Sequence, residues 1–277
     1  MKDIRKLLVI VNPDVREDYV LTRARRLAQA FRPEVELLVS EPGLEAAQGY
    51  FSDLDVHVNT RISDRRVDFE TVLSRIRAFR PDLTLKSIRR RHPLARLLVT
   101  GTDWKLVRHS PAPLWLVKSR DWHVNGCILA SVDPLHSKAQ QNELDHLLLE
   151  SATTLADRLE LETRIFHCYF PDLATMFPKV LDAGNYLQQR RAEHQTKMET
   201  LLESHQLGMR NVVMARGDLI RTLGKTIRKE QANLLVLGAL SRNVVERAIV
   251  GSTTERMLNE SRCDVLVMKS HAQQRSS

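Results

Sequence analysis

The chain has 277 residues, of which 43% are hydrophobic and 27% charged, and its formal net charge is +8. This is the composition of an ordinary globular protein, and the length suits about two domains. Aromatic residues make up only 5%, which argues against the exposed ring platforms that bind single-stranded nucleic acid. The densest basic run is Arg89–His92, and we interpret it as a solvated loop. Direct sequence-specific binding of nucleic acid is therefore not expected.

Three cysteines, Cys127, Cys168 and Cys263, lie far apart within apolar runs, so we expect buried thiols. No Cys/His spacing typical of zinc occurs, and we expect no metal site. The N-terminal segment lacks the pattern of a secretory signal, and no stretch approaches 18 uncharged apolar residues. These features predict a cytoplasmic protein without a membrane span.

Short aliphatic runs typical of β-strands alternate with amphipathic helical stretches along the chain. The helical pattern is clearest in YVLTRARRLAQAF (19–31) and NELDHLLLESATTLADRL (142–159). Strands that alternate with helices predict βαβ units and a parallel sheet. The expected strands, in chain order, are Lys6–Val11, Val35–Ser40, Val56–Thr60, Leu83–Lys86, Leu114–Lys118, Cys127–Val132, Thr163–Tyr169, Asn211–Ala215, Leu234–Gly238 and Asp264–Lys269.

The two halves of the chain repeat one plan. Residues 82–118 fall on 233–269 without a gap, and their apolar patterns agree nearly throughout. The second copy carries about thirty extra residues, which we expect as a helical insertion near 171–206. We predict a first domain over 1–120 and a second over 125–272. Two such similar and closely tethered domains are expected to pair face to face with pseudo-two-fold symmetry, and the seam is expected along their last strands.

The stretch LLVLGALSRNVVERAIVGSTTERML, residues 234–258, joins a strand to a helix through small residues. Gly238 ends the strand, and Gly251 and Ser252 precede the helix. A glycine lets an anion approach the main chain, and the free N–H groups at a helix start can hold phosphate oxygens. Ser252 and Thr253 add hydroxyl donors. Asp133 ends another strand at the same edge, where it could accept hydrogen bonds from a ribose or a base.

The same residues have a purely structural interpretation. Ser252 and Glu255 have the spacing of a capping box. Gly238 is also explained as the end of a strand, and Asp133-Pro134 as a turn. Neither glycine is followed by the Lys-Ser/Thr pair of a P-loop. Local chemistry leaves both interpretations open.

A family resemblance bears on this choice. The spacing Gly238-x2-Ser241-x9-Gly251-Ser252 resembles the Gly-x2-Gly-x9-Gly-Ser/Thr motif of the universal stress protein family. The stretch TGTDWKLVRHSPAPLWLVK (100–118) resembles one typical of the tandem E-type members of proteobacteria. The resemblance implies two tandem domains, each a Rossmann-like five-stranded parallel sheet flanked by helices, similar to adenine nucleotide alpha hydrolases. It also implies a stress-response or tolerance factor, with a link to resistance to DNA damage in the E-type.

Some members of the family bind ATP, and the resemblance carries candidate residues over to domain two. Asp133 matches the contact to adenosine, and Cys168 a backbone contact to adenine. Ser241 departs from the motif, since it replaces the second glycine. Mg²⁺ is implied only as the companion of bound ATP. The residues matched to the phosphate loop are Gly238, Ser241, Gly251, Ser252 and Thr253, with Arg242 and Arg247 as further phosphate contacts or solvated side chains.

Domain one departs further from the motif. Ser87, Arg90 and Thr100 stand at the positions of Gly238, Ser241 and Gly251, and Asn12 at that of Asp133. Side chains therefore occupy the space where bare main chain is needed, and we expect no ATP in domain one. Trp104, just inside the following helix, is interpreted as a packing residue rather than a ligand platform.

No catalytic constellation is recognisable, so an enzyme is not expected, beyond slow and incidental ATP hydrolysis. The sequence has no Walker lysine, and its histidines are dispersed and interpreted as surface or core residues: His136, His146, His167 and His194. Two other functions stay open. Domain two could bind an apolar or amphipathic molecule, or the protein could be a protein–protein module with relic pockets, either as a monomer or as a homodimer. The apolar or amphipathic ligand is suggested by apolar residues near the start of the extra helix, which are Met176, Phe177, Val180, Leu181 and Tyr186.

Overall fold

The computed structural model describes residues 3–11, 18–40, 44–63, 67–88, 101–135, 139–169, 183–239 and 252–270. The basic run Arg89–His92, His136 and the residues Met176 to Leu181 lie outside these ranges, as does the side chain of Tyr186. No helix within the described ranges is both long and apolar enough to cross a membrane.

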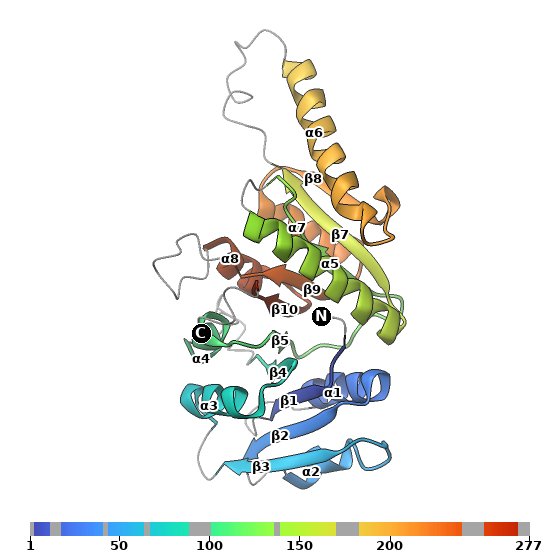
Figure 1. Ribbon diagram of the computed structural model, residues 1–277. Helices are drawn as coiled ribbons and strands as arrows, with labels where there is room; N and C mark the ends of the chain where they lie inside the picture. The colour runs from blue at the N-terminus through green and yellow to red at the C-terminus, as the bar shows by residue number, and fades with distance from the viewer. Residues whose placement is uncertain are drawn as a thin grey trace.

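Within the described residues, ten strands form one sheet in the order β3-β2-β1-β4-β5-β10-β9-β6-β7-β8 (Figure 1). Read from either end, each half has the order 3-2-1-4-5 and is parallel throughout. The predicted α/β class and all ten expected strands are confirmed, with no boundary off by more than three residues. The strands are β1 Lys6–Val11, β2 Glu34–Ser40, β3 Val58–Ser63, β4 Leu83–Ser87, β5 Leu114–Val117, β6 Cys127–Ser131, β7 Glu162–Tyr169, β8 Val212–Arg216, β9 Ala232–Gly238 and β10 Asp264–Met268.

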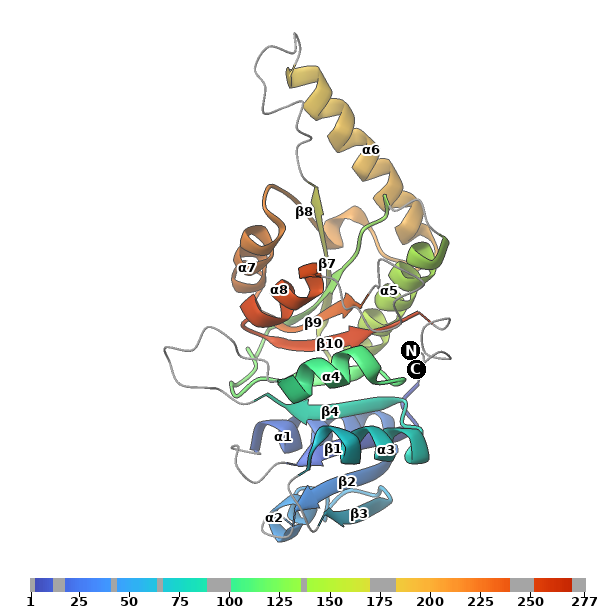
Figure 2. The same cartoon turned by 90° about the vertical axis from the view of Figure 1, so that its left-hand side faces the viewer.

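Helices cover both faces of the sheet, so the sheet lies between two hydrophobic cores. One core contains residues of α1, α2, α5 and α6, and the other contains residues of α3, α4, α7 and α8, the layer nearer the viewer in Figure 2. Each core runs through both halves of the chain. The helices are α1 Asp18–Phe31, α2 Leu44–Gly49, α3 Phe69–Phe79, α4 Gly101–His109, α5 Ala139–Leu159, α6 Ala183–Glu203, α7 Leu219–Lys229 and α8 Ser252–Glu260, with a 3₁₀ turn η3 at Met209–Asn211.

Helix α6 is the main difference between the halves. It follows β7 as α2 follows β2, yet it has 21 residues where α2 has 6. Figures 1 and 2 both show it projecting beyond the end of the sheet that β7 and β8 form. The described part of the expected insertion is therefore a single long helix, attached at one end of the molecule.

The two halves meet edge to edge. Strands β5 and β10 pair antiparallel, with Trp115 opposite Leu266. The seam lies along the last strands, as expected, but the face-to-face contact predicted from the repeat is wrong. A last strand with apolar side chains on both faces would otherwise leave a row of unpaired backbone groups at the edge of its sheet. Pairing the two edges satisfies those groups and joins the halves into one sheet.

Two lysines tie each half to a helix of the other half. Nζ of Lys118, after β5, donates to the carbonyl oxygens of Leu258 (3.2 Å) and Ser261 at the end of α8. Nζ of Lys269, after β10, donates to the carbonyls of Arg108 (2.6 Å) and Ser110 (2.9 Å) at the end of α4. Both lysines satisfy carbonyls that a helix end leaves open. Burial lowers the pKa of each to about 8.

Asp264, at the start of β10, is the polar centre of the seam and is fully buried. Its carboxylate accepts hydrogen bonds from Arg23 Nε (3.0 Å), Trp122 Nε1 (3.0 Å) and the main-chain N–H of Lys118 (2.8 Å). The Arg23 guanidinium also lies over the Trp122 ring, 4.6 Å from its centroid. Burial raises the pKa of Asp264, and Arg23 acts in the opposite direction. One carboxylate thus joins α1, the linker and both central strands.

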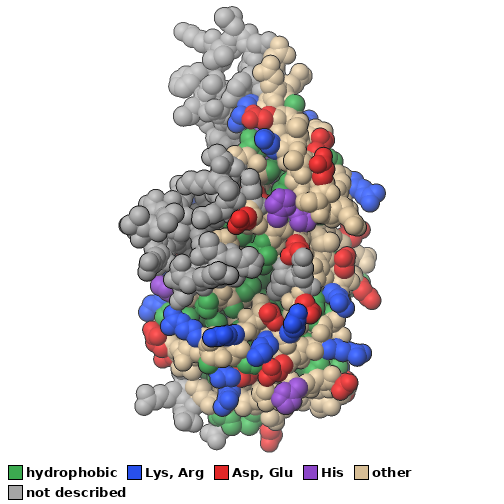
Figure 3. All heavy atoms as spheres, viewed as in Figure 1, with side chains coloured by type: hydrophobic (Ala, Val, Ile, Leu, Met, Phe, Trp, Pro, Cys, Tyr) green, Lys and Arg blue, Asp and Glu red, His purple; other side chains and the backbone are tan. Residues whose placement is uncertain are grey.

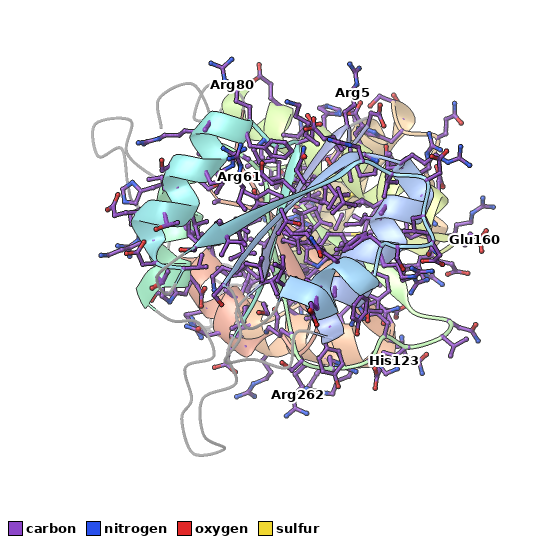
Figure 4. The ribbon with its side chains drawn as sticks, turned by 90° about the horizontal axis from the view of Figure 1, so that it is seen from below. Arg5, Arg61, Arg80, His123, Glu160 and Arg262 are labelled. Atoms are coloured by element: carbon purple, nitrogen blue, oxygen red, sulfur yellow. The ribbon has the colours of Figure 1, made fainter. Side chains whose placement is uncertain are left out.

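The linker between the halves is held by Asn233, at the start of β9. Its side chain accepts the main-chain N–H of His123 (2.7 Å) and donates to the same residue's carbonyl (2.9 Å). A Cβ on Gly126 would lie 2.2 Å from Asn233 Nδ2, so only glycine fits there. Arg120 donates from Nη1 to the Arg262 carbonyl (2.8 Å). Figure 4 shows His123 and Arg262 on the same side of the molecule.

Candidate functional site

The carboxyl ends of β9, β6 and β7 lie side by side at one edge of the sheet. Strand β6 has β7 as one neighbour and β9 as the other, which makes this a switch point of the strand order. Gly238 ends β9, Asp133 follows β6 by two residues, and Cys168 is the penultimate residue of β7. The fold therefore brings three of the predicted site residues to one edge.

The rest of the predicted phosphate loop is not placed. Ser241, Arg242, Arg247 and Gly251 lie outside the described residues, and so do the side chains of Ser252 and Thr253. Helix α8 begins at Ser252, one residue earlier than the sequence predicted. Their roles remain predictions.

Asp133 is paired through its main chain with a carboxylate of α5. Its N–H donates to both oxygens of Asp145, at 3.2 and 3.4 Å. Asp145 is buried, and this burial, together with the nearby charge of Asp133, raises the pKa of Asp145 to about 7. Asp133 and Asp145 thus form an acidic pair at the switch point, and Asp145 is still partly protonated at neutral pH.

Replacing Asp145 with asparagine is expected to raise the thermal midpoint at pH 8 and to change it little at pH 4. The pKa of Asp145 in the folded protein, about 7, lies above its ordinary value of 3.8. Between these two pH values the folded state therefore binds more protons than the unfolded state. The stability that Asp145 contributes is complete below its unfolded pKa and is lost as pH rises through about 7. Thermal melts of both proteins at pH 4, 6 and 8 measure this. An equal shift at all three pH values would show that charge is not the cause.

Cys168 is held by its surroundings rather than poised for reaction. Its Sγ lies 3.3 Å from the carbonyl oxygen of Gly217 and 3.2 Å from Thr222 Oγ1. Burial raises the pKa of this half-buried thiol, which opposes formation of a reactive thiolate. Cys127 and Cys263 are buried and free, and burial raises the pKa of each to about 12. The prediction of buried thiols is confirmed for these two, whereas Cys168 is partly exposed.

Gly238 is packed against α5. A Cβ at this position would lie 2.5 Å from Leu144 Cδ2 and 3.1 Å from its Cγ. The Gly238 carbonyl accepts a hydrogen bond from Thr254 Oγ1 of α8, at 3.3 Å. The space that the missing side chain leaves is therefore filled by Leu144. Close approach of helix to strand explains this glycine, and the room expected there for an anion is not present on that side.

The matching edge of the first half carries a buried ion pair. Lys86 Nζ in β4 lies 2.6 Å from Asp103 Oδ1 in α4, and both side chains are buried. At the repeat offset of 151, their counterparts are the uncharged Leu237 and Thr254. Ser87 is also buried where the second half has glycine. Asn12, Arg90 and Thr100 lie outside the described residues. Trp104 is partly buried against the core, as the packing interpretation predicted.

Sequence reasoning missed two histidine pairs beside this site. His167 Nε2 and His194 Nδ1 are 2.7 Å apart, and His146 Nδ1 and His205 Nε2 are 2.8 Å apart. The residues are dispersed along the chain, and only the buried stripe of α6 signals one of them, because His194 precedes Met198 by one helical turn. Within the described ranges, no three His, Cys, Asp or Glu side chains are grouped to hold a metal ion.

Solved structures of similar fold cover nearly the whole chain. A protein of unknown function from Pseudomonas aeruginosa PAO1 matches with a TM-score of 0.85 and 22% identity, over 99% of this chain and 96% of that one. A universal stress protein from Archaeoglobus fulgidus matches with a TM-score of 0.62 and 14% identity, over 96% of this chain and 98% of that one. At these identities the likeness supports the fold.

Sequence relatives give the family. Universal stress protein E of Salmonella typhi is 26% identical over 224 residues, covering 79% of this chain and 71% of that protein. Universal stress protein E of Photorhabdus laumondii is 22% identical over 302 residues, covering 97% and 96%. Residues 134–269 match the model of the universal stress protein family. The chain therefore belongs to the universal stress protein family.

Proposed function

We propose that the protein is a cytoplasmic stress-response factor whose second domain, residues 125–272, binds ATP, with Mg²⁺ as the companion of the nucleotide. The first domain, residues 1–120, serves as a scaffold that binds no nucleotide. In this proposal the two domains form a pseudo-symmetric pair within one chain, which is also able to form a homodimer. The protein acts by binding rather than by catalysis.

The convergence of β6, β7 and β9 carries the proposal. Asp133 emerges between Cys168 and Gly238 at the switch point, where ligands of parallel α/β sheets bind. Helix α8 starts at Ser252. Its Thr254 donates to the Gly238 carbonyl, which places the start of the helix near the same edge of the sheet. A helix start supplies free N–H groups for phosphate oxygens. The adenosine part would then lie near Asp133 and Cys168, and the phosphates near the start of α8.

The first domain supports the proposal that only the second domain binds a nucleotide. Its corresponding edge holds the Lys86–Asp103 ion pair and the buried Ser87. A nucleotide entering there would have to displace or desolvate a paired charge, and breaking a buried pair is strongly unfavourable. We infer that this pair replaced the ligand as the element that fills the edge.

Mass spectrometry of small molecules released from freshly purified, denatured protein tests the ligand class. The proposal predicts ATP or ADP in the released fraction. Calorimetry with Mg-ATP then locates the site: Asp133→Ala is expected to weaken binding at least tenfold, a loss of about 1.4 kcal/mol, because it removes the hydrogen-bond acceptor for the adenosine part.

Asn12→Ala is the matched control, since Asn12 occupies the position of Asp133 in the first domain. This variant is expected to bind ATP as the wild type does. Release of a lipid or another apolar molecule would favour the alternative ligand class. No ATP binding by the wild-type protein would remove the nucleotide proposal and leave a protein–protein module.

A further inference from the structure

Helix α6 is attached to the body of the protein by two histidine pairs. His194, in α6, bonds to His167 of β7. His205, two residues past the end of α6, bonds to His146 of α5. Figure 3 shows histidine side chains on the face where α5 and α6 lie in Figure 1. We call these four residues the histidine clamp.

The hydrogen bonds of the inner pair fix the tautomer of His167 when this ring is neutral. His167 Nδ1 lies 3.1 Å from the Val132 carbonyl oxygen, which can only accept, so Nδ1 carries a proton. In neutral His167, Nε2 then accepts from His194 Nδ1. Both rings are buried, His167 completely. The Tyr169 ring lies against His194, with centroids 5.0 Å apart.

Among the described residues, few charges act on His194 and His205, and burial has the largest influence on the pKa of each. Burial lowers the pKa of His194, as do His167 and Arg190, whereas Asp133 and Glu193 act in the opposite direction. In the outer pair, burial and His146 lower the pKa of His205, and Glu150 of α5 opposes them. In both pairs the histidine at α6 resists protonation while it is docked.

In the part of the chain that the structure describes, little else holds the helix. Besides His194, the buried side chains of α6 are Met198, Leu201 and Leu202, and most of its other described side chains are exposed. When both rings of a pair take up a proton, the ring nitrogen that accepts the hydrogen bond is lost. Two cations then lie within hydrogen-bond distance of each other. A small apolar contact then has to oppose that repulsion, so attachment of α6 depends on the state of the clamp.

We propose that the histidine clamp is an acid-sensitive latch, which keeps α6 docked at neutral pH and releases it when the pairs take up protons. The sign follows from linkage. The docked rings of His194 and His205 have pKa values below the ordinary value of 6.5, so the released state holds more protons below that pH. Docking is complete above about pH 6.5 and weakens as pH falls below it.

Release would change the candidate site. The clamp residue His167 and its acceptor Val132 directly precede Cys168 and Asp133. Undocking α6 therefore frees the chain next to both residues at the carboxyl edge of β6 and β7. The proposed latch depends only on the contacts of α6, whether or not a nucleotide binds at that edge.

Hydrogen exchange of the full chain, in EDTA, at pH 7.5 and pH 5.5 tests the latch. After correction for intrinsic exchange rates, amides of residues 187–203 are expected to lose at least tenfold in protection at pH 5.5. Uptake of two protons alone would raise the opening constant about 100-fold for each pH unit in the titrating range. Amides of β9 serve as the internal reference and should keep their protection.

The double variant His194→Asn with His205→Gln removes one titrating ring from each pair and keeps a side-chain amide to hydrogen bond. It is expected to lose most of the acid response, whereas His57→Gln, at an exposed site in the first half, should respond as the wild type does. Equal protection of wild-type α6 at both pH values would overturn the proposal. So would loss of α6 and β9 protection together, or a full acid response in the double variant. If the double variant does not fold, the wild-type comparison decides alone.

Discussion

Replacing Asp264 with alanine is expected to lower the free energy of unfolding by about 3–5 kcal/mol, since it leaves the Arg23 guanidinium buried without its partner. The main-chain N–H of Lys118 and Nε1 of Trp122 lose their acceptor as well. For a chain of this length, the thermal midpoint should fall on the order of 10 °C. Denaturant unfolding and thermal melts measure the two quantities.

Two further variants separate the buried charge from a general effect of losing a carboxylate. Asp53→Ala breaks an exposed ion pair with Arg25 and is expected to leave stability unchanged. Arg23→Met in the Asp264→Ala protein removes the orphaned cation and should restore part of the loss. If Asp264→Ala is no more harmful than Asp53→Ala, the seam does not depend on this carboxylate.

Gly238→Ala is expected to destabilise the protein by about 1–3 kcal/mol through overpacking against Leu144. The added Cβ would lie within 2.5 Å of a side chain that is itself buried in the core. Denaturant unfolding measures the loss, and calorimetry with Mg-ATP on the same variant measures any change in binding.

A double-mutant cycle with Leu144→Ala tests the cause. The single change Leu144→Ala should itself lower stability by about 2–5 kcal/mol. In that background Gly238→Ala is expected to have little effect, because the new methyl group occupies the vacated space, and the two effects are then not additive. Additive losses would contradict the packing explanation. An unaltered stability with lost ATP binding would return Gly238 to the phosphate loop.

The strands and their parallel direction within each half follow from local patterns in the sequence. Aliphatic runs such as those at Lys6–Val11 and Cys127–Ser131 are bounded by helical stretches, and the alternation dictates parallel βαβ units. The third strand was predicted least accurately, because β3 lies at the sheet edge and its residues are half exposed. Edge strands carry a weaker apolar signal.

Contacts between residues far apart in the chain could not be predicted in this way. Asp264 and Arg23 are 241 positions apart, and His205 and His146 are 59 apart. No local period links such residues. The repeat predicted that the halves pair through their last strands, but their edge-to-edge geometry depends on which backbone groups stay unpaired when each half folds.

The candidate site was predicted in outline. Parallel strand order alone places Asp133, Cys168 and Gly238 at one edge. The role of Leu144 was missed, since it depends on how closely α5 packs against β9 rather than on any motif. The Lys86–Asp103 pair was also missed, although the repeat places a lysine and an aspartate where the second half has uncharged residues.

The number of ATP molecules bound by each chain tests the proposed division between the domains most directly. Native mass spectrometry with Mg-ATP should show one nucleotide for each wild-type chain. Gly251→Arg should abolish that binding, and Thr100→Arg, at the matching position of the first domain, should leave it intact. Two nucleotides for each chain, or one that survives Gly251→Arg and disappears in Thr100→Arg, would contradict the account.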